Sequence, residues 1–284
     1  MGAPTCGIVV PVRDEAEALA TTVPALLAAC IGERPRIVWV CNGCSDGSAA
    51  RIRALAGASA EIVECESPGK TEALQTGDDR LGDLFPRLYL DADVHLRRGD
   101  VTRLLEPIRT GSADLVAAQL SFDCSRSSAA ATAIARCWLE LPHARHHSFS
   151  AAIGLSKAGR ETWDRWPRVQ GDDVFVIANT PPERRRIVQG AVATTWAPAS
   201  FGAWVRARRR WIQGERQLAA LGFKRPAASG QRAALLKRFI SPRTMVGAAL
   251  FTAARVLGSG PSWNGPRHGW RPDRPPSCPA DDRR

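Results

Sequence analysis

The chain lacks several features that would place it in a simple class. No apolar run is long enough to cross a bilayer, although 44% of the 284 residues are hydrophobic. Residues 1–6 contain no basic stretch followed by an apolar one, so we expect no secretory signal. There is no internal repeat, and no helix-turn-helix, zinc-finger or ribonucleoprotein motif. These absences predict a cytoplasmic globular protein with no specific nucleic-acid partner.

The cysteines also lack the spacing of a metal site. Only Cys41 and Cys44, of 8 cysteines, form a C-x-x-C, and neither a second pair nor a histidine follows at zinc spacing. A redox or zinc role is therefore disfavoured. Reduced thiols are the default state in the cytoplasm.

Apolar runs alternate with amphipathic stretches in the first half of the chain. The apolar runs predict strands at residues 7–12, 36–40, 60–65 and 87–90. The stretches between them predict helices at residues 15–30, 46–56 and 70–81. This alternation predicts a Rossmann-like α/β fold, a mostly parallel sheet with helices on both faces. Ligands of such sheets bind at the C-terminal ends of the strands.

Two carboxylates close the fourth predicted strand. Asp91-Ala92-Asp93 directly follows the apolar run Leu88-Tyr89-Leu90. Such a pair costs desolvation energy unless a cation lies beside it. Mg²⁺ or Mn²⁺ bridging to a nucleotide diphosphate would supply that cation, because both ions prefer hard oxygen ligands. A D-x-D alone also fits a solvated turn, so the neighbouring motifs decide.

Five further motifs follow the same order along the chain: Val10-Pro11-Val12-Arg13-Asp14-Glu15, Val40 to Ser48, Gly69 to Gly77, Gly171-Asp172-Asp173 and Arg208 to Trp211. With Asp91-Ala92-Asp93, this series resembles the family 2 glycosyltransferases, which have a GT-A fold and use nucleotide sugars. The resemblance covers roughly residues 7–214, and its specificity lies in the series rather than in any one motif.

The resemblance implies a nucleotide pocket built from the first three motifs. Pro11 and Glu15 match the first motif, in which Asp14 replaces the usual Asn. Asn42 stands where the family often has an Asp that accepts a hydrogen bond from the base, and an amide oxygen can still accept one. Asp46 matches a further acidic position. It is equally suited to cap a helix, and the two roles are compatible.

Lys70 resembles the family lysine that contacts the nucleotide, although a solvated lysine at a helix start is the alternative. Gly69-Lys70-Thr71 also resembles the end of a P-loop. We reject an ATPase because Glu64 occupies the position of the first glycine of that motif.

The resemblance implies that Asp91 and Asp93 contact ribose and metal, with Asp93 as the more direct metal ligand. Asp173 matches the general base that deprotonates the acceptor hydroxyl, with inversion at the anomeric carbon. Asp172 would orient the acceptor or itself act as the base. An acidic pair at a helix start is also a routine capping feature.

The last motif implies that Arg210 clamps the diphosphate and that Trp211 stacks on a sugar. Ala207 occupies the place of a family glutamine that is typical of processive polysaccharide synthases. Because those synthases also carry membrane spans, which are missing here, transfer of a single sugar is favoured. The departures at Asp14, Asn42 and Ala207 leave open an inactive member of the family.

Positive charge is concentrated near the C-terminus. Residues 1–200 contain 22 Lys and Arg against 24 Asp and Glu, whereas residues 201–284 contain 17 against 4. Such asymmetry indicates an anionic partner for the C-terminal part. Because apolar residues interleave with the cations of residues 206–255, we expect peripheral binding to an anionic membrane surface. The acceptor would then be a lipid-linked hydroxyl compound, and a small metabolite is the other acceptor that we consider. A solvated helical face is the alternative.

These patterns predict three regions. Residues 1–203 form the catalytic domain, with a nucleotide-binding half at about 1–110 and an acceptor half at about 111–203. A basic helical segment at residues 204–257 completes the site. Residues 258–284, rich in Pro, Gly and Arg, form a disordered tail.

The leading interpretation is a metal-dependent, inverting glycosyltransferase that uses a UDP-sugar. One alternative is a nucleotidyltransferase with a related sheet, against which the downstream acidic pair and Arg-Trp motif argue. Another is a non-enzymatic basic protein that binds nucleic acid or membranes, which depends on the C-terminal charge alone.

Overall fold

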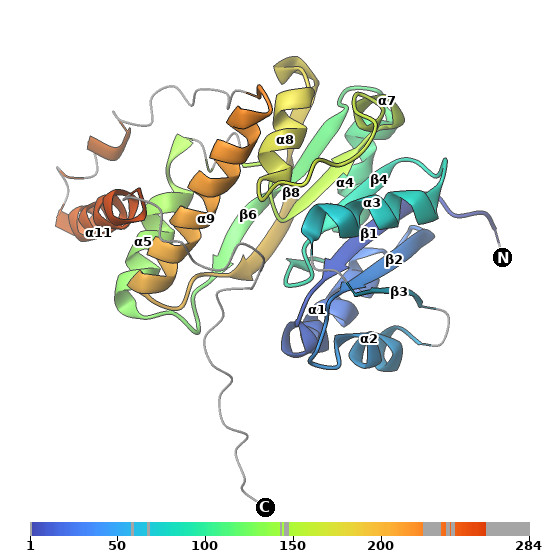
Figure 1. The fold of residues 1–284 in the computed structure, drawn as a ribbon, viewed down its shortest axis with the longest axis horizontal. Helices are drawn as coiled ribbons and strands as arrows, with labels where there is room; N and C mark the ends of the chain where they lie inside the picture. Colours follow the sequence, from blue (N-terminus) through green and yellow to red (C-terminus); the bar gives the residue numbers. More distant parts are fainter. Residues whose placement is uncertain are drawn as a thin grey trace, which may run out of the picture.

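A computed structural model describes residues 2–57, 60–66, 69–142, 144, 148–223, 234–236, 239 and 242–259 (Figure 1). The nucleotide-binding half contains β1 Cys6–Val12, α1 Ala16–Ala29, β2 Pro35–Asn42, α2 Ser48–Ala56, β3 Glu61–Cys65, α3 Lys70–Leu81, β4 Arg87–Leu90, β5 His95–Leu96 and α4 Asp100–Arg109. The remainder contains β6 Leu115–Asp123, α5 Ala129–Leu139, β7 Ala152–Leu155, α7 Lys157–Arg160, α8 Asp172–Asn179, a 3₁₀ turn Pro182–Arg184, β8 Arg185–Trp196, α9 Phe201–Ala220 and α11 Pro242–Gly258.

One eight-stranded sheet organises the fold, in the order β3-β2-β1-β4-β7-β6-β8-β5. The first four of these strands pair in parallel. β7 is antiparallel to both of its neighbours, and β6 and β8 are parallel. The predicted α/β class with a mostly parallel sheet is therefore confirmed. Because β1, β2 and β4 are parallel, their C-terminal ends open onto the same edge.

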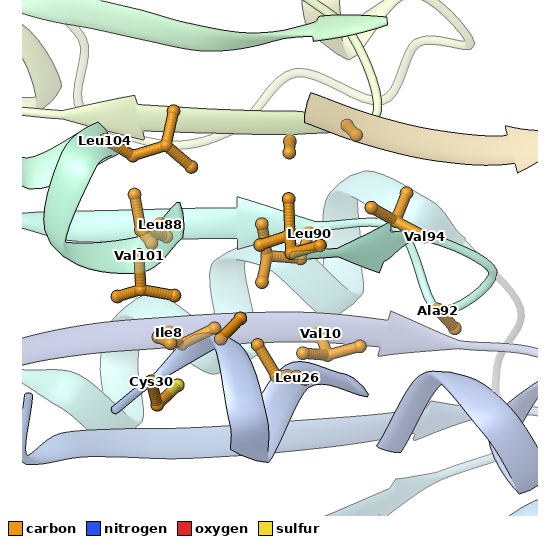
Figure 2. Packing of buried hydrophobic residues seen from close by; sticks show 14 of the residues in the cluster. Ile8, Val10, Leu26, Cys30, Leu88, Leu90, Ala92, Val94, Val101 and Leu104 are labelled. Atoms are coloured by element: carbon orange, nitrogen blue, oxygen red, sulfur yellow. The ribbon is translucent and has the colours of Figure 1, made fainter. Parts of the chain in front are cut away.

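Helices cover both faces of the sheet, as predicted. On one face, α1, α2 and α4 bury a core with the inward side chains of β1 and β4, among them Ile8, Val10, Leu88 and Leu90 (Figure 2). On the other face, α3 and α8 pack on Val9 and Tyr89. Alternate residues of each strand thus enter different cores, which is why the strands are apolar almost throughout.

Contact between α3 and the sheet is unusually close. A Cβ atom added at Gly77 would lie 2.3 Å from Cγ1 of Val9, so only glycine allows α3 to approach β1 this closely. The approach matters for function because Lys70 is the first residue of α3.

A third core joins the C-terminal helices to α5. Trp138, Trp204 and Phe251 are its largest members, contributed by α5, α9 and α11. Figure 1 shows these three helices grouped at one side of the molecule, away from β1–β3. The predicted tail at residues 258–284 lies outside the described residues from residue 260 onwards, and the predicted regional boundaries remain predictions. No helix among the described residues is both long and apolar enough to cross a bilayer.

Glu33 connects the loop after α1 to α4, and its pairing predicts a pH-dependent stability. Arg109 donates to its two oxygens at 2.7 and 2.8 Å, and Thr5 donates at 2.7 Å. The hydrogen bonds from Arg109 lower the pKa of Glu33 from its ordinary value of 4.5 to about 2, against the opposing effect of burial. The folded-state pKa is depressed, so this contribution is complete above pH 4.5 and is lost as the pH falls towards 2.

We expect Glu33→Gln to lower the free energy of unfolding by about 1–2 kcal/mol at neutral pH. The deficit should shrink as the pH falls below the ordinary pKa of glutamate. Urea denaturation at pH about 7 and about 3.5 measures it. Glu64→Gln is the matched control, because Glu64 pairs with Arg53 while its side chain is 60% exposed. A deficit that stays constant over this range would contradict the assignment.

Candidate functional site

The candidate site lies where β1, β2 and β4 end. Val12, the last residue of β1, pairs with Cys41, and Val9 pairs with Tyr89 two residues before Asp91. The residues that follow these strands therefore converge. α3 starts beside them at Lys70, directly after the backbone of Gly69.

Lys70 joins two parts of the chain that are distant in sequence. Its Nζ lies 2.7 Å from Oδ1 of Asp91 and 2.9 Å from Oδ2 of Asp172. Burial acts to lower the pKa of Lys70, but the nearby charges of Asp172 and Asp91 outweigh it and raise the pKa. The ammonium is therefore held charged between the D-x-D motif and the acidic pair. The structure brings these three predicted site residues together.

Asp93 is held by a residue of β8. The hydroxyl of Thr195, near the end of β8, donates to Oδ2 of Asp93 at 2.9 Å. Burial, and then the negative charge of Asp91, raise the pKa of Asp93 to about 6. Asp93 is thus a buried carboxylate whose charged form is disfavoured, and the charge of its neighbour Asp91 adds to that effect.

This donor set fits a divalent metal ion. Asp91 and Asp93 offer hard oxygen ligands, and a cation there would favour the charged form of Asp93, which burial and then the negative charge of Asp91 disfavour. Across the described residues there is no group of three or more His, Cys, Asp or Glu suited to a metal. A diphosphate and water offer further oxygen ligands of the same hard type.

Asn42 anchors the start of α3. It is buried, its Oδ1 accepts from the backbone N–H of Gly69 at 3.0 Å, and its Nδ2 donates to the carbonyl of the same residue. The predicted contact with a base would use the second lone pair of Oδ1. Asn42 thus has a structural task that the sequence pattern did not indicate.

Asp46 bridges the turns after β1 and β2. Its Oδ2 accepts from the N–H of Ala16 at 2.8 Å, and its Oδ1 accepts from the N–H of Ser48 at 3.0 Å. Each of these donors is the first residue of a helix, so the expected capping role is present, and it extends to α1. Asp14, at φ +50°, accepts from the N–H of Ser45 at 2.7 Å and closes the same pair of turns.

Asp172 and Asp173 are the first two residues of α8. Asp172 is directed to Lys70, whereas Oδ1 of Asp173 accepts from the N–H of Val174 at 2.8 Å. The turn before them is supported by α9: the N–H of Gln170 donates to Oε1 of Gln217 at 2.8 Å. Helix α9 therefore sets the position of the acidic pair.

Comparisons with solved structures identify the architecture. The chain is similar to a mannosyltransferase from Pyrobaculum calidifontis in complex with GDP-mannose and Mn²⁺, with a TM-score of 0.59, 15% identity, and coverage of 92% of this chain and 77% of that one. It is also similar to glucosyl-3-phosphoglycerate synthase from Mycobacterium tuberculosis in complex with Mn²⁺, UDP-glucose and phosphoglyceric acid, with a TM-score of 0.52, 15% identity, and coverage of 80% and 82%.

The chain has a GT-A fold. The expectation of that fold from the motif series is confirmed. No protein-family model matches the sequence, and no curated protein sequence matches it. The likeness to the solved structures is therefore one of architecture.

The remaining predicted residues occupy two regions of the GT-A domain. Pro11 lies in β1 and Glu15 is buried at the start of α1. Arg210 and Trp211 lie together in α9. Trp211 is 38% exposed and packs against Trp138 and Trp204, with ring centroids 6.4 and 6.3 Å apart. It has one covered face, and its role towards a sugar remains a prediction.

Sequence reasoning missed three residues of this GT-A site. Thr195 is one of two adjacent threonines in β8, and only the strand pairing places it by Asp93. Gly214 lies within the predicted helical segment, where a glycine has no obvious role in the sequence. In the structure an added Cβ atom would lie 3.0 Å from the carbonyl group of Gln170. Arg13 follows β1 directly, and its Nε and Nη1 are buried with no hydrogen-bond acceptor among the described residues. The sequence could have indicated Arg13, because it is a cationic residue directly after a predicted strand.

Proposed function

We propose that this protein is a metal-dependent glycosyltransferase that moves one sugar from a nucleotide-sugar to a hydroxyl acceptor. One observation carries the proposal: Lys70 lies between Asp91 of the D-x-D motif and Asp172 of the acidic pair, at the sheet edge where ligands of α/β folds bind. That arrangement supports a diphosphate-binding role for this edge, with the candidate base next to it. The solved structures with this fold, described above, hold nucleotide-sugars and Mn²⁺.

We assign donor binding to the edge formed by Asn42, Asp46, Lys70 and Asp91, together with Pro11 and Glu15. Asp93 and Asp91 would hold Mg²⁺ or Mn²⁺. When bound, the metal would neutralise charge that develops on the leaving diphosphate. Lys70 supplies a second positive charge at the same edge, and Arg210 is assigned to the diphosphate as well. A UDP-sugar is the favoured donor.

We assign proton abstraction to Asp173 and orientation to Asp172. Asp172 already accepts from the Lys70 ammonium at 2.9 Å, which suits a carboxylate that holds position. Asp173, its neighbour in the first turn of α8, would take the proton of the acceptor hydroxyl as its oxygen attacks the anomeric carbon. Attack from the face opposite the leaving diphosphate inverts the anomeric configuration.

The rest of the proposal concerns the acceptor and the setting of the reaction. We place this reaction in the cytoplasm, with a lipid-linked or small-metabolite hydroxyl as acceptor. Trp211 is proposed as the stacking residue for a sugar. Assignment to glycosyltransferase family 2 is part of the proposal and depends on the motif series. A nucleotidyltransferase is the second candidate. It would release pyrophosphate, which the glycosyltransferase would not.

Calorimetric binding of UDP and GDP, with and without Mn²⁺, tests this function. We expect Mn²⁺-dependent UDP binding that Asp93→Ala weakens by about 100-fold, because the variant loses a carboxylate ligand. Asp83→Ala is the matched control, since Asp83 is 93% exposed and lies away from the strand ends. Preference for GDP would retain the function and change the donor. No binding of either nucleotide would refute the proposal.

We expect Arg13→Met to weaken UDP binding by about tenfold. The buried Nε and Nη1 of Arg13 meet no protein acceptor among the described residues, so an oxygen of the donor is the natural partner. Arg80→Met, on the exposed side of α3, should leave binding unchanged. Comparing uridine, UMP and UDP shows whether the base or the phosphates supply the oxygen. Equal affinity of wild type and Arg13→Met for all three would contradict the role.

A further inference from the structure

Helix α11 is apolar on two opposite faces. One face packs on α5 and α9 through Ala248, Phe251 and Ala254, which are 0%, 5% and 4% exposed. This contact fixes the orientation of α11 on the GT-A domain. The opposite face must therefore point to solvent.

That outer face consists of apolar side chains only. Met245, Val246, Val256 and Leu257 are 46%, 58%, 66% and 53% exposed. Ala249 and Ala253 lie between them at helical spacing and are also exposed. We call these six residues the α11 face. It extends over the whole described length of the helix, whereas isolated exposed aliphatic residues are common on any protein.

Positive charge lies beside the α11 face. Helices α9 and α11 contain seven arginines, and Glu215 is their only acidic residue. Glu215 is itself 3.6 Å from Arg208. Nη2 of Arg209 donates to the carbonyl of Leu257 at 3.3 Å, which places a guanidinium group at the end of the face. The folded domain thus presents an apolar strip with a cation at one end of it.

We propose that the α11 face docks on an anionic lipid bilayer, with its aliphatic side chains at the level of the headgroup–acyl boundary and the guanidinium group of Arg209 on the headgroup phosphates. This combination of exposed aliphatic residues and flanking cations is what an interfacial helix requires. A second copy of the chain fits less well, because it would bring two arginine-rich surfaces together. A nucleic acid would match the charge and would leave the aliphatic side chains in water.

Vesicle flotation of the full chain tests the proposal without depending on the transferase reaction. We compare vesicles of phosphatidylcholine with vesicles of phosphatidylcholine mixed with phosphatidylglycerol, at roughly 0.15 M salt. We expect binding to the mixed vesicles only. The double substitution Val256→Glu and Leu257→Glu should lower the partition coefficient at least about tenfold, because it places two charges in the apolar strip.

A matched control uses Leu27→Glu with Ile31→Glu. These two residues are 41% and 45% exposed and belong to α1 and the turn that follows it, which Figure 1 shows well separated from α11. The control should bind vesicles as the wild type does, and circular dichroism checks that both double variants remain folded. Binding that is lost equally in both double variants would overturn the role of α11.

Three other outcomes would also overturn the proposal. The wild type could remain unbound with anionic vesicles. The wild type and the Val256→Glu, Leu257→Glu variant could bind equally well. Light scattering could show a dimer that the variant abolishes, without vesicle binding by the wild type, and the α11 face would then be a contact between copies of the chain.

Discussion

Lys70→Met is expected to lower kcat/KM for sugar transfer by about 10²–10⁴-fold. Methionine keeps much of the length of lysine and removes its charge. Without the ammonium group, Asp91 and Asp172 lose the cation that both contact, at 2.7 and 2.9 Å. The diphosphate of the donor would then meet two carboxylates with less compensating charge. Initial rates at saturating Mn²⁺, with donor concentration varied, measure the loss.

Lys157→Met separates this effect from a general loss of charge. Lys157 also contacts two carboxylates, of Asp83 and Glu161, at 3.4 and 3.7 Å, but its side chain is 53% exposed. We expect transfer by this variant to match the wild type. Rates should be measured below the thermal transition of each variant, so that unfolding does not enter. Full activity of Lys70→Met would contradict the assignment of Lys70 to the donor site.

Asp78→Ala is expected to lower the free energy of unfolding by about 3–5 kcal/mol. Asp78 is 4% exposed, and its carboxylate pairs with Arg87 at 2.7 Å and Arg160 at 2.6 Å, which are themselves buried. Tyr89 and Trp166 donate to the same carboxylate at 2.7 and 2.8 Å. The substitution would leave two guanidinium groups in the protein interior without their anion.

Denaturation by urea, followed by circular dichroism, measures this loss. Asp83→Ala offers a control on the neighbouring loop, where the side chain is 93% exposed, and should change stability by less than about 0.5 kcal/mol. If Asp78→Ala cost no more than its control, the cluster would be dispensable. Asp78 lies on α3, eight residues after Lys70, so the substitution should also loosen the helix that carries Lys70.

The first half of the fold could be predicted because its strands enter two cores. Apolar runs such as Arg36–Val40 and Arg87–Leu90 have no polar alternation, which is typical of parallel strands covered on both faces. β7 and β8 gave no comparable signal. β7 has only four residues, and β8 begins with two arginines and has an exposed polar centre at Gln189 and Gly190. Their assignment depends on pairing with β6, which is a tertiary property.

The site shows the same division between local and tertiary information. The predicted parallel strands indicated a ligand site at their C-terminal ends, and Asn42, Lys70 and Asp91 lie at or just after those ends. No local pattern indicated that Lys70 would reach Asp172, about a hundred residues later, or that Asn42 would bind the backbone of Gly69. The buried charged cluster around Asp78 could not be predicted from the sequence either, because the partners of Asp78 come from three separate segments.

The contact at Gly214 shows that the GT-A domain includes helix α9. Helix α9 lies so close to the backbone of Gln170 that a Cβ atom at Gly214 would be 3.0 Å from its carbonyl group, and one of the two segments would have to shift. A chain that stopped before Phe201 would keep every motif residue as far as Asp173, yet it would lose the wall behind Asp172. Truncation and domain-exchange designs should therefore keep α9 together with the rest of the GT-A domain, and should leave Gly214 unchanged.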